Sequence, residues 1–243
     1  MTLRIKGATT IKGLTTVGPA LTAIPGLQLW LDASDASTIT IGTGVSQWND
    51  KSGNGNNATQ ATGSAQPTVQ TAAQNGRNTI RFTAASLQVM ALTSTINLTS
   101  TGYTFLGVIR RGGPSGTNIL PIVTSSSNNR VYVPMWFSDG NLYMTGTAQQ
   151  TYTSSAQSST TYNQFSGTYN SAGTSGAMYF NGSSLSVTSG ASGTVTMSFD
   201  QIGRSIDGYA NGEIAEILLY NSVLSTANRQ AVEAYLKAKW ATP

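Results

Sequence analysis

Short runs in which apolar and polar residues alternate follow one another through most of this chain, and no helical pattern separates them. Near the start, Leu27, Leu29 and Leu31 alternate with Gln28 and Trp30. A period of two residues is typical of strands with one buried face. Similar runs cover residues 79–82, 103–109, 119–123, 131–137, 142–144, 164–169, 177–180, 195–199 and 214–220. Strands without helices between them exclude βαβ architecture and favour a sandwich or a barrel.

The composition agrees with a fold rich in strands and turns. Thr, Ser, Asn and Gly supply 107 of the 243 residues, and all four are poor helix formers. Thr suits strands, whereas Ser, Asn and Gly suit turns. Hydrophobic residues make up 39% of the chain, which is enough for a packed core. We therefore expect one β-sandwich domain.

The chain contains no histidine and no cysteine. This composition excludes disulfides, metal sites built from His or Cys, and Ser-His-Asp hydrolases. The 13 basic and 9 acidic residues give a net charge of +4, but the basic residues are scattered. Nucleic-acid binding usually needs a clustered basic surface, so we expect no nucleic-acid partner. No apolar run approaches the roughly 18 to 20 residues of a membrane span, so we expect no membrane partner and no signal peptide.

The first 25 residues contain a direct repeat, in which IKGATT from Ile5 is followed at once by IKGLTT from Ile11. A six-residue period with one aliphatic residue and one glycine resembles a short piece of β-helix or β-prism, which needs partners to bury its apolar row. We predict that residues 1–25 form an extended arm in which Ile5, Ile11 and Leu14 contact neighbouring subunits or an assembly. A flexible tail whose repetition is coincidental is the alternative.

Pro25-Gly26 marks the predicted boundary between this arm and a domain of residues 26–243. Only the end of the domain has the period of a helix. Ser225 is placed to cap that helix, and Glu233 is placed to pair with Lys237 at i+4. The apolar residues of the helix are Val232, Tyr235, Leu236 and Trp240. Their spacing predicts one face that packs on the sandwich.

Three segments, in this order, resemble the concanavalin A-like jelly-roll superfamily, in particular laminin-G-like domains of bacterial and phage proteins. They are GLQLWLDAS at 26–34 followed by WNDKSGNGNNA at 48–58, the hairpin MYFNG at 178–182, and GEIAEILLYN at 212–221. The resemblance implies an all-β jelly-roll sandwich of two antiparallel sheets, here with an extended N-terminal arm and one C-terminal helix. Asn181-Gly182 is also a hairpin signal by itself, because both residues tolerate positive φ.

The Thr/Gly-rich leader before a jelly roll adds a second resemblance, to tailed-phage virion proteins such as head decoration proteins, fibres and adhesins. That resemblance implies synthesis in the host cytoplasm and a place on the surface of the particle. It also implies partners: copies of the same chain, with a trimer as one possibility, and other virion proteins. The jelly-roll fold alone does not define the function, since it hosts lectins, glycosidases, lyases and structural modules.

Residues 50–55 resemble a calcium loop, because Asp50, Ser52 and Asn54 place side-chain oxygens at alternate positions and a glycine stands sixth. The twelfth position of such a loop supplies a bidentate carboxylate, and here it is Ala61. One carboxylate makes a weak calcium site, whereas Asn-Gly and Ser-Gly form tight turns without a metal. We expect a turn and no cofactor, with calcium as the alternative.

Glu213 and Glu216 suggest a glycosidase, but residues three apart in a regular strand point to opposite faces. We expect Glu216 on the face of Ile214, at a sheet edge. Glycosidases of the resembled superfamily carry Glu and Asp at alternate positions of one strand, and this chain has no Glu-x-Asp. Its lyases generally pair a Tyr with a His or Asn and an Arg, which leaves Tyr132 with Arg130 as a narrow candidate. We therefore expect no enzymatic activity.

Aromatic residues offer a candidate glycan-binding surface. Within residues 130–137, Tyr132 and Trp136 alternate with aliphatic residues, and Tyr143 lies on the face of Asn141. If the aliphatic face is the core, Tyr132, Trp136, Asn141 and Tyr143 form an exposed platform suited to stacking on sugar rings. Coverage of that face by another element or subunit is the alternative.

Together these features predict a non-enzymatic phage virion structural protein, either a head decoration protein or a fibre. It would display a lectin-like jelly roll that binds host-surface glycans. A carbohydrate-active enzyme or carbohydrate-binding module acting on a polysaccharide is the alternative. The first hypothesis expects homo-oligomers or particle association that depend on residues 1–25, and the second expects a monomeric cleft with two convergent titratable groups.

Overall fold

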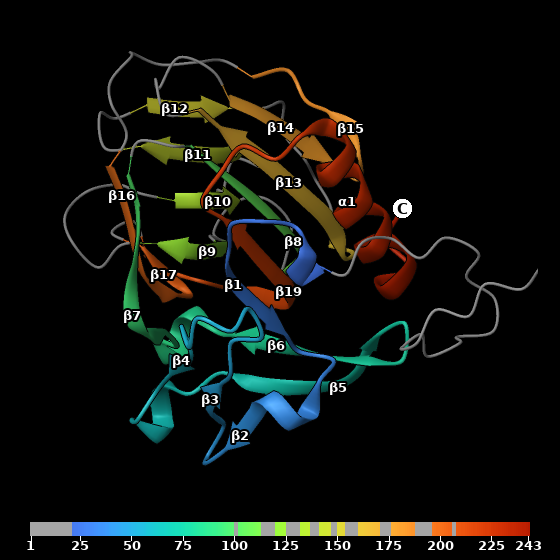
Figure 1. Ribbon diagram of the computed structural model, residues 1–243. Helices are drawn as coiled ribbons and strands as arrows, with labels where there is room; N and C mark the ends of the chain where they lie inside the picture. Colours follow the sequence, from blue (N-terminus) through green and yellow to red (C-terminus); the bar gives the residue numbers. More distant parts are fainter. Residues whose placement is uncertain are drawn as a thin grey trace, which may run out of the picture.

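Figure 1 shows the computed structural model of the chain, whose strands form two packed antiparallel sheets. The structure describes residues 21–99, 102–112, 120–124, 132–136, 141–146, 150–153, 160–170, 176–187, 196–205 and 208–243. The predicted all-β sandwich with one C-terminal helix is confirmed in these residues. Ile5, Ile11 and Leu14 of the predicted arm lie outside them.

Sheet A has eight strands in the order β15-β14-β13-β8-β19-β6-β5, with β1 also paired to β19. Its strands are β1 (Leu27–Asp32), β5 (Thr68–Gln74), β6 (Arg77–Phe82), β8 (Tyr103–Arg111), β13 (Asn163–Tyr169), β14 (Gly176–Phe180), β15 (Ser183–Ser184) and β19 (Gly212–Tyr220). Long β19 therefore lies inside the sheet, between β8 on one side and both β6 and β1 on the other.

Sheet B has nine strands in the order β12-β11-β10-β9-β16-β7-β4-β3-β2. Its strands are β2 (Ile39–Ile41), β3 (Val45–Trp48), β4 (Ala58–Thr59), β7 (Met90–Thr99), β9 (Leu120–Thr124), β10 (Tyr132–Trp136), β11 (Leu142–Gly146), β12 (Gln150–Thr153) and β16 (Thr196–Ile202). A small ribbon of β17 (Arg204–Ser205) and β18 (Gly208–Tyr209) follows β16.

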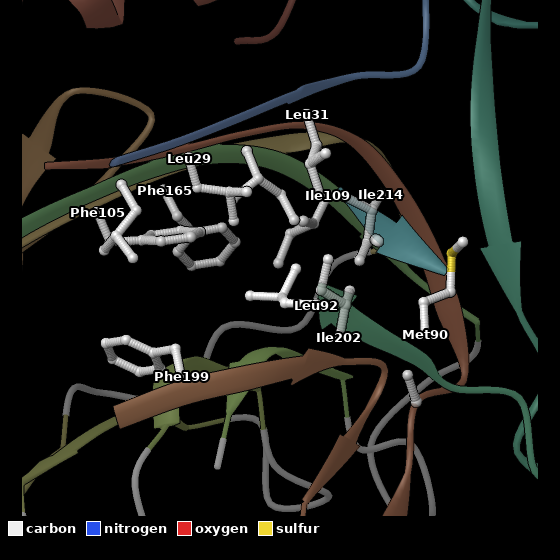
Figure 2. Packing of buried hydrophobic residues seen from close by; sticks show 14 of the residues in the cluster. Leu29, Leu31, Met90, Leu92, Phe105, Ile109, Phe165, Phe199, Ile202 and Ile214 are labelled. Atoms are coloured by element: carbon white, nitrogen blue, oxygen red, sulfur yellow. The ribbon is translucent and has the colours of Figure 1, made fainter. Parts of the chain in front are cut away.

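The main core lies between the two sheets, and Figure 2 shows its packing. Phe105 and Phe165 of sheet A project toward Phe199 of sheet B. Leu29 and Leu31 of β1 belong to this core and are fully buried, as their alternation predicts. The intervening residue, Trp30, packs in a second cluster on the other face of sheet A, here called the outer face. The prediction is wrong for Leu27, which also packs on the outer face because the register shifts between Leu27 and Leu29.

The outer face of sheet A carries the helix α1 (Thr226–Trp240), which lies against β8 and β13 (Figure 1). The backbone N–H of Asn228 donates to the Ser225 side chain at 3.2 Å, so the predicted cap is confirmed. The predicted apolar face is confirmed as well, because Val232, Leu236 and Trp240 are fully buried in the second cluster.

The predicted ion pair between Glu233 and Lys237 is wrong. Glu233 is buried, and its carboxylate accepts from Arg229 one turn earlier and from Ser166 of β13. Lys237 is exposed. Glu233 faces the sheet rather than the solvent, and a buried carboxylate needs buried donors. The Arg229 guanidinium is itself fixed over the Tyr179 ring, 3.6 Å from its centroid.

Two further features connect the sequence with local structure. Asn181 and Gly182 have φ of +50° and +78° and join β14 to β15, so the predicted hairpin is confirmed. Leu21, in a short 3₁₀ turn (Leu21–Ala23), and Ile24 are buried in the second cluster. Residues 21–25, which the sequence assigns to the arm, therefore pack on the domain.

Candidate functional site

A β-bulge in β19 brings Glu213 and Glu216 to the same face of sheet A. Ile214 pairs with Ile109 of β8, but Glu216 pairs with the next residue, Val108, so Ala215 is an extra residue in β19. Because a bulge shifts the alternation by one position, the expectation that the two glutamates point to opposite faces is wrong. Ile214 lies in the main core, so Glu216 does not share its face.

Glu216 is fully buried under α1 and is surrounded by donors. Its Oε1 accepts from Trp30 Nε1 at 2.7 Å and from Tyr235 Oη at 2.9 Å. Its Oε2 accepts from Trp240 Nε1 at 2.6 Å and from Lys239 Nζ at 2.8 Å. The expected place at a sheet edge is therefore wrong, since β19 is internal and the carboxylate is enclosed.

Asp32 lies directly opposite Glu216 on β1 and shares the same cation. Lys239 Nζ is 2.7 Å from Asp32 Oδ1, and Lys51 Nζ is 2.9 Å from Asp32 Oδ2. Burial and the charge of Asp32 raise the pKa of Glu216 against the opposing effect of Lys239. Burial would also raise the pKa of Asp32, but the Lys239 charge and hydrogen bonds from Lys239, Ser34 and Lys51 outweigh it and lower that pKa. This enclosed network holds α1 on the sheet.

Glu213 lies between two arginines whose side chains are partly exposed to solvent. It pairs across the sheet with Arg81 of β6 on one side and with Arg110 of β8 on the other. The Glu213 carboxylate is buried, and its Oε1 accepts from Arg81 Nε at 3.0 Å and from Arg110 Nη2 at 2.5 Å. The guanidinium side chains remain 43% and 33% exposed. The carboxylate thus anchors two cations that face the solvent.

The other carboxylate oxygen of Glu213 accepts from the hydroxyls of Tyr162 and Thr79. Burial would raise the pKa of Glu213, but hydrogen bonds from Tyr162, Arg81 and Thr79 and the charge of Arg110 together lower it. Burial and the hydrogen bond to Glu213 raise the pKa of Tyr162 to about 12. At neutral pH the cluster therefore contains an ionised carboxylate, a neutral phenol and two guanidinium ions.

Two surface depressions open over this cluster and share Arg81, Arg110 and Glu213 in their walls. The first has a volume of about 370 Å³ and is also lined by Val69, Gln70, Thr71, Ala73 and Tyr162. The second has about 340 Å³ and is also lined by Phe82, Gly112, Asn211 and Gly212. The walls are thus mainly amides, hydroxyls and guanidinium groups, which suit a polar ligand.

The predicted aromatic platform lies on sheet B, in β10 and at β11. Asn141 and Tyr143 are half-buried, while the side chains of Tyr132 and Trp136 lie outside the described part of the structure. The register pairs Trp136 with Leu142, whose side chain is fully buried, and it pairs Met135 with Tyr143. This pairing gives no support for Trp136 and Tyr143 on one face, and the platform stays a prediction.

The candidate calcium loop forms a closed turn against β1. The Asp50 carboxylate accepts from the backbone N–H groups of Trp30, Ser52 and Asn56 at 2.9 to 3.0 Å and from the Ser52 hydroxyl at 2.6 Å. Asn54 donates to a carbonyl of β1. These bonds use the acceptor capacity of the carboxylate, as expected for a turn. Among the described residues, no three His, Cys, Asp or Glu side chains gather in a way that could hold a metal.

Sequence reasoning missed the arginines and Tyr162. Arg81 lies between the core residues Ile80 and Phe82, so alternation alone could have placed it on the outer face. Its pairing with Glu213 depends on the strand order, which the sequence does not reveal.

In the described part of the chain, no helix is long and apolar enough to cross a membrane.

Comparisons with known proteins agree with the fold. The model of the Laminin_G_3 family, of the concanavalin A-like lectin/glucanases superfamily, matches residues 85–228. A search of curated proteins found no match. A solved structure of Trypanosoma rangeli sialidase with the inhibitor DANA has a TM-score of 0.58 and 13% identity, covering 94% of this chain and 36% of the sialidase.

The binding domain of botulinum neurotoxin serotype D is similar to the same extent, with a TM-score of 0.57 and 15% identity. The match covers 92% of this chain and 56% of that one. The present chain thus spans only part of each of these structures, and at such identities the likeness concerns the fold alone. Since the family model covers more than half of the chain, this protein belongs to the laminin-G-like family of the concanavalin A-like lectin/glucanase superfamily.

Proposed function

We propose that this protein is a non-enzymatic structural protein of a phage particle, a decoration protein or fibre, that displays a lectin-like jelly roll and binds host-surface glycans. The observation that carries the binding role is the polar depression on the outer face of sheet A. Gln70, Thr71 and the two arginines in its walls are donors and acceptors of the kind that sugar hydroxyls need. The likeness to a toxin's binding domain agrees with this role.

The burial of Glu216 and the hydrogen bonding and ionisation of Glu213 support the proposal that the protein is not an enzyme. Most glycosidases need two carboxyl groups on either side of one bond, with the acid protonated near neutral pH. Glu216 is enclosed under α1, and the acceptor positions of Glu213 are filled by arginines and hydroxyls. Since these partners lower the pKa of Glu213, it stays ionised and is a poor general acid.

The virion role rests on the leader and on the surface chemistry. The hexad repeat in residues 1–25 resembles the arms of virion proteins, and the chain has only 22 charged residues among 243. Subunit contacts made by packing and neutral hydrogen bonds would depend little on salt. A display protein that must remain attached under varied ionic conditions benefits from such contacts.

Binding without turnover is the expected result when the full chain is incubated with a panel of neutral and acidic polysaccharides. Bound polymer should be recovered with unchanged length, no new reducing ends and no unsaturated sugars. Measurement combines a glycan-binding assay with size analysis of the polymer over many hours. Cleavage that Glu213→Gln abolishes would instead establish the alternative, a carbohydrate-active enzyme.

The arm hypothesis predicts a difference in mass between the full chain and a chain of residues 21–243. The cut belongs before Leu21, because Leu21 and Ile24 are buried in the second cluster and their loss would expose the α1 interface. Light scattering should give a trimer or larger assembly for residues 1–243 and a monomer for residues 21–243. Equal thermal unfolding temperatures would show that the shorter chain is folded. Monomers in both samples would contradict self-association through the arm.

A further inference from the structure

We infer that the depression over Glu213 is a subsite for a carboxylate-bearing sugar, a uronic or sialic acid unit of an acidic glycan, held by Arg81 and Arg110. The inference rests on the proposed glycan-binding function and names the class of ligand for one site. It places recognition on the outer face of sheet A, whereas the predicted aromatic platform belongs to sheet B.

The charge of the cluster fits one carboxylate. Arg81 and Arg110 carry two positive charges, Glu213 carries one negative charge, and the Tyr162 hydroxyl is neutral at physiological pH because its pKa is about 12. The net charge of +1 matches a carboxylate better than a phosphate monoester, whose charge is about −1.5 to −2. Among the residues that line the two depressions, only these two arginines are basic, so a polyanion such as nucleic acid would find too few cations.

The guanidinium groups keep donors that Glu213 does not use. Each has five N–H donors in a planar fork that matches a carboxylate. Arg81 uses Nε and Nη2 toward Glu213, and Arg110 uses Nη2. The buried Arg110 Nε has no hydrogen-bond partner among the described residues. Glu213 therefore fixes both forks without using all their donors. Both arginine side chains stay partly exposed and line the two depressions.

The rest of the walls fit a sugar ring. Gln70, Thr71 and Asn211 present amides and a hydroxyl, while Val69 and Ala73 present small apolar surfaces. A volume of about 370 Å³ lies within the range of small-molecule sites. Since Glu213 is itself held by Thr79 and Tyr162, the arginines are oriented before a ligand arrives, which lowers the entropic cost of binding.

The test uses the full chain and pairs of probes that differ only in their carboxylates. Trigalacturonate is compared with its methyl ester, and sialyllactose with lactose, by titration calorimetry or ligand-observed NMR. We expect each acid to bind at least about tenfold more tightly than its neutral partner, as a charge-assisted bidentate pair allows. Inorganic phosphate and sulfate serve as further probes, and an acidic peptide represents a protein partner.

Variants locate the binding at the arginines. Arg81→Gln and Arg110→Gln should each weaken binding of the acids at least about tenfold, while Arg110→Lys, which keeps the charge and loses the fork, should have an intermediate effect. Glu213→Gln keeps an oxygen that accepts from both arginines, so they stay oriented, but it removes the negative charge that competes with the ligand. This variant should therefore tighten binding, a result that a purely structural role for these residues would not produce. Lys237→Gln removes one charge at an exposed position of α1 and should change nothing. Thermal unfolding verifies that each variant is folded.

The outcomes separate this inference from the function on which it rests. Equal affinity for the acid and its methyl ester, or acid binding that the arginine variants leave unchanged, would overturn the carboxylate subsite and leave glycan binding intact. Tighter binding of phosphate, sulfate or the acidic peptide would overturn it as well. If no glycan binds, acidic or neutral, both proposals fail.

Discussion

Replacing Trp240 by alanine is expected to lower the free energy of unfolding by about 3–5 kcal/mol, the usual range for loss of a buried tryptophan. The indole is fully buried between α1 and the outer face of sheet A. Its Nε1 also donates to Glu216 Oε2 at 2.6 Å. The substitution therefore leaves a cavity and takes one donor from a buried carboxylate, and both changes destabilise the fold. Equilibrium unfolding in denaturant, followed by circular dichroism, measures the difference.

Two controls divide this loss into its parts. Trp240→Phe retains most of the packing but removes the N–H group, so it should cost about 1–3 kcal/mol, the penalty for an unsatisfied buried acceptor. Lys237→Ala changes an exposed residue of the same helix and should stay within about 0.5 kcal/mol of the parent chain. A Trp240→Ala variant as stable as Lys237→Ala would contradict the packing of α1 on sheet A.

The elements with the clearest apolar pattern could be predicted from the sequence. The alternation of Leu29 and Leu31 in β1, the Asn181-Gly182 hairpin and the apolar stripe of α1 are each local signals, and the structure confirms them. Several edge strands were missed because their apolar residues are few. β5, for example, reads TVQTAAQ, lies at the edge of sheet A and buries little of its surface. For such a strand the pairing partner, rather than its own pattern, determines the conformation. Sequence reasoning also missed β7, an internal strand of sheet B that supplies Met90, Leu92, Ile96 and Leu98 to the core.

The candidate site could be predicted less well, because it depends on strand order and register. Glu213 meets Arg81 and Arg110 only because β6 and β8 flank β19 on either side. No local pattern in the sequence predicts the bulge at Ala215, yet that single extra residue turns Glu216 toward α1. The local pattern thus predicts which residues can face outward, and the tertiary pairing decides which of them meet.

The second large effect is expected from Lys239→Met, which should lower the free energy of unfolding by about 3–5 kcal/mol near neutral pH, as when one partner of a buried ion pair is removed. Lys239 Nζ lies between Glu216 and Asp32, 2.8 and 2.7 Å from their oxygens. It is the only cation in contact with Glu216 in the described part of the chain, although Lys51 still contacts Asp32 in the variant. Two carboxylates that face each other across β1 and β19 would then share a buried site with one cation fewer.

The pH dependence distinguishes this electrostatic cause from a loss of packing. In the parent chain, Lys239 helps to hold the pKa of Asp32 below its ordinary value of 3.8, so this contribution is present above that value and is lost as the pH falls through the lowered pKa. The pKa of Glu216 is already raised in the parent chain. Without Lys239, burial and mutual repulsion raise the pKa values of Asp32 and Glu216 above those of the parent, so the folded variant binds more protons than the folded parent as the pH falls. The stability of Lys239→Met relative to the parent should therefore improve between about pH 7 and about pH 5. Unfolding curves at these two pH values measure the difference in unfolding free energy between Lys239→Met and the parent. Lys237→Met is the control for losing a lysine of α1. If this difference in unfolding free energy is the same at both pH values, Lys239 acts through its aliphatic chain rather than through its charge.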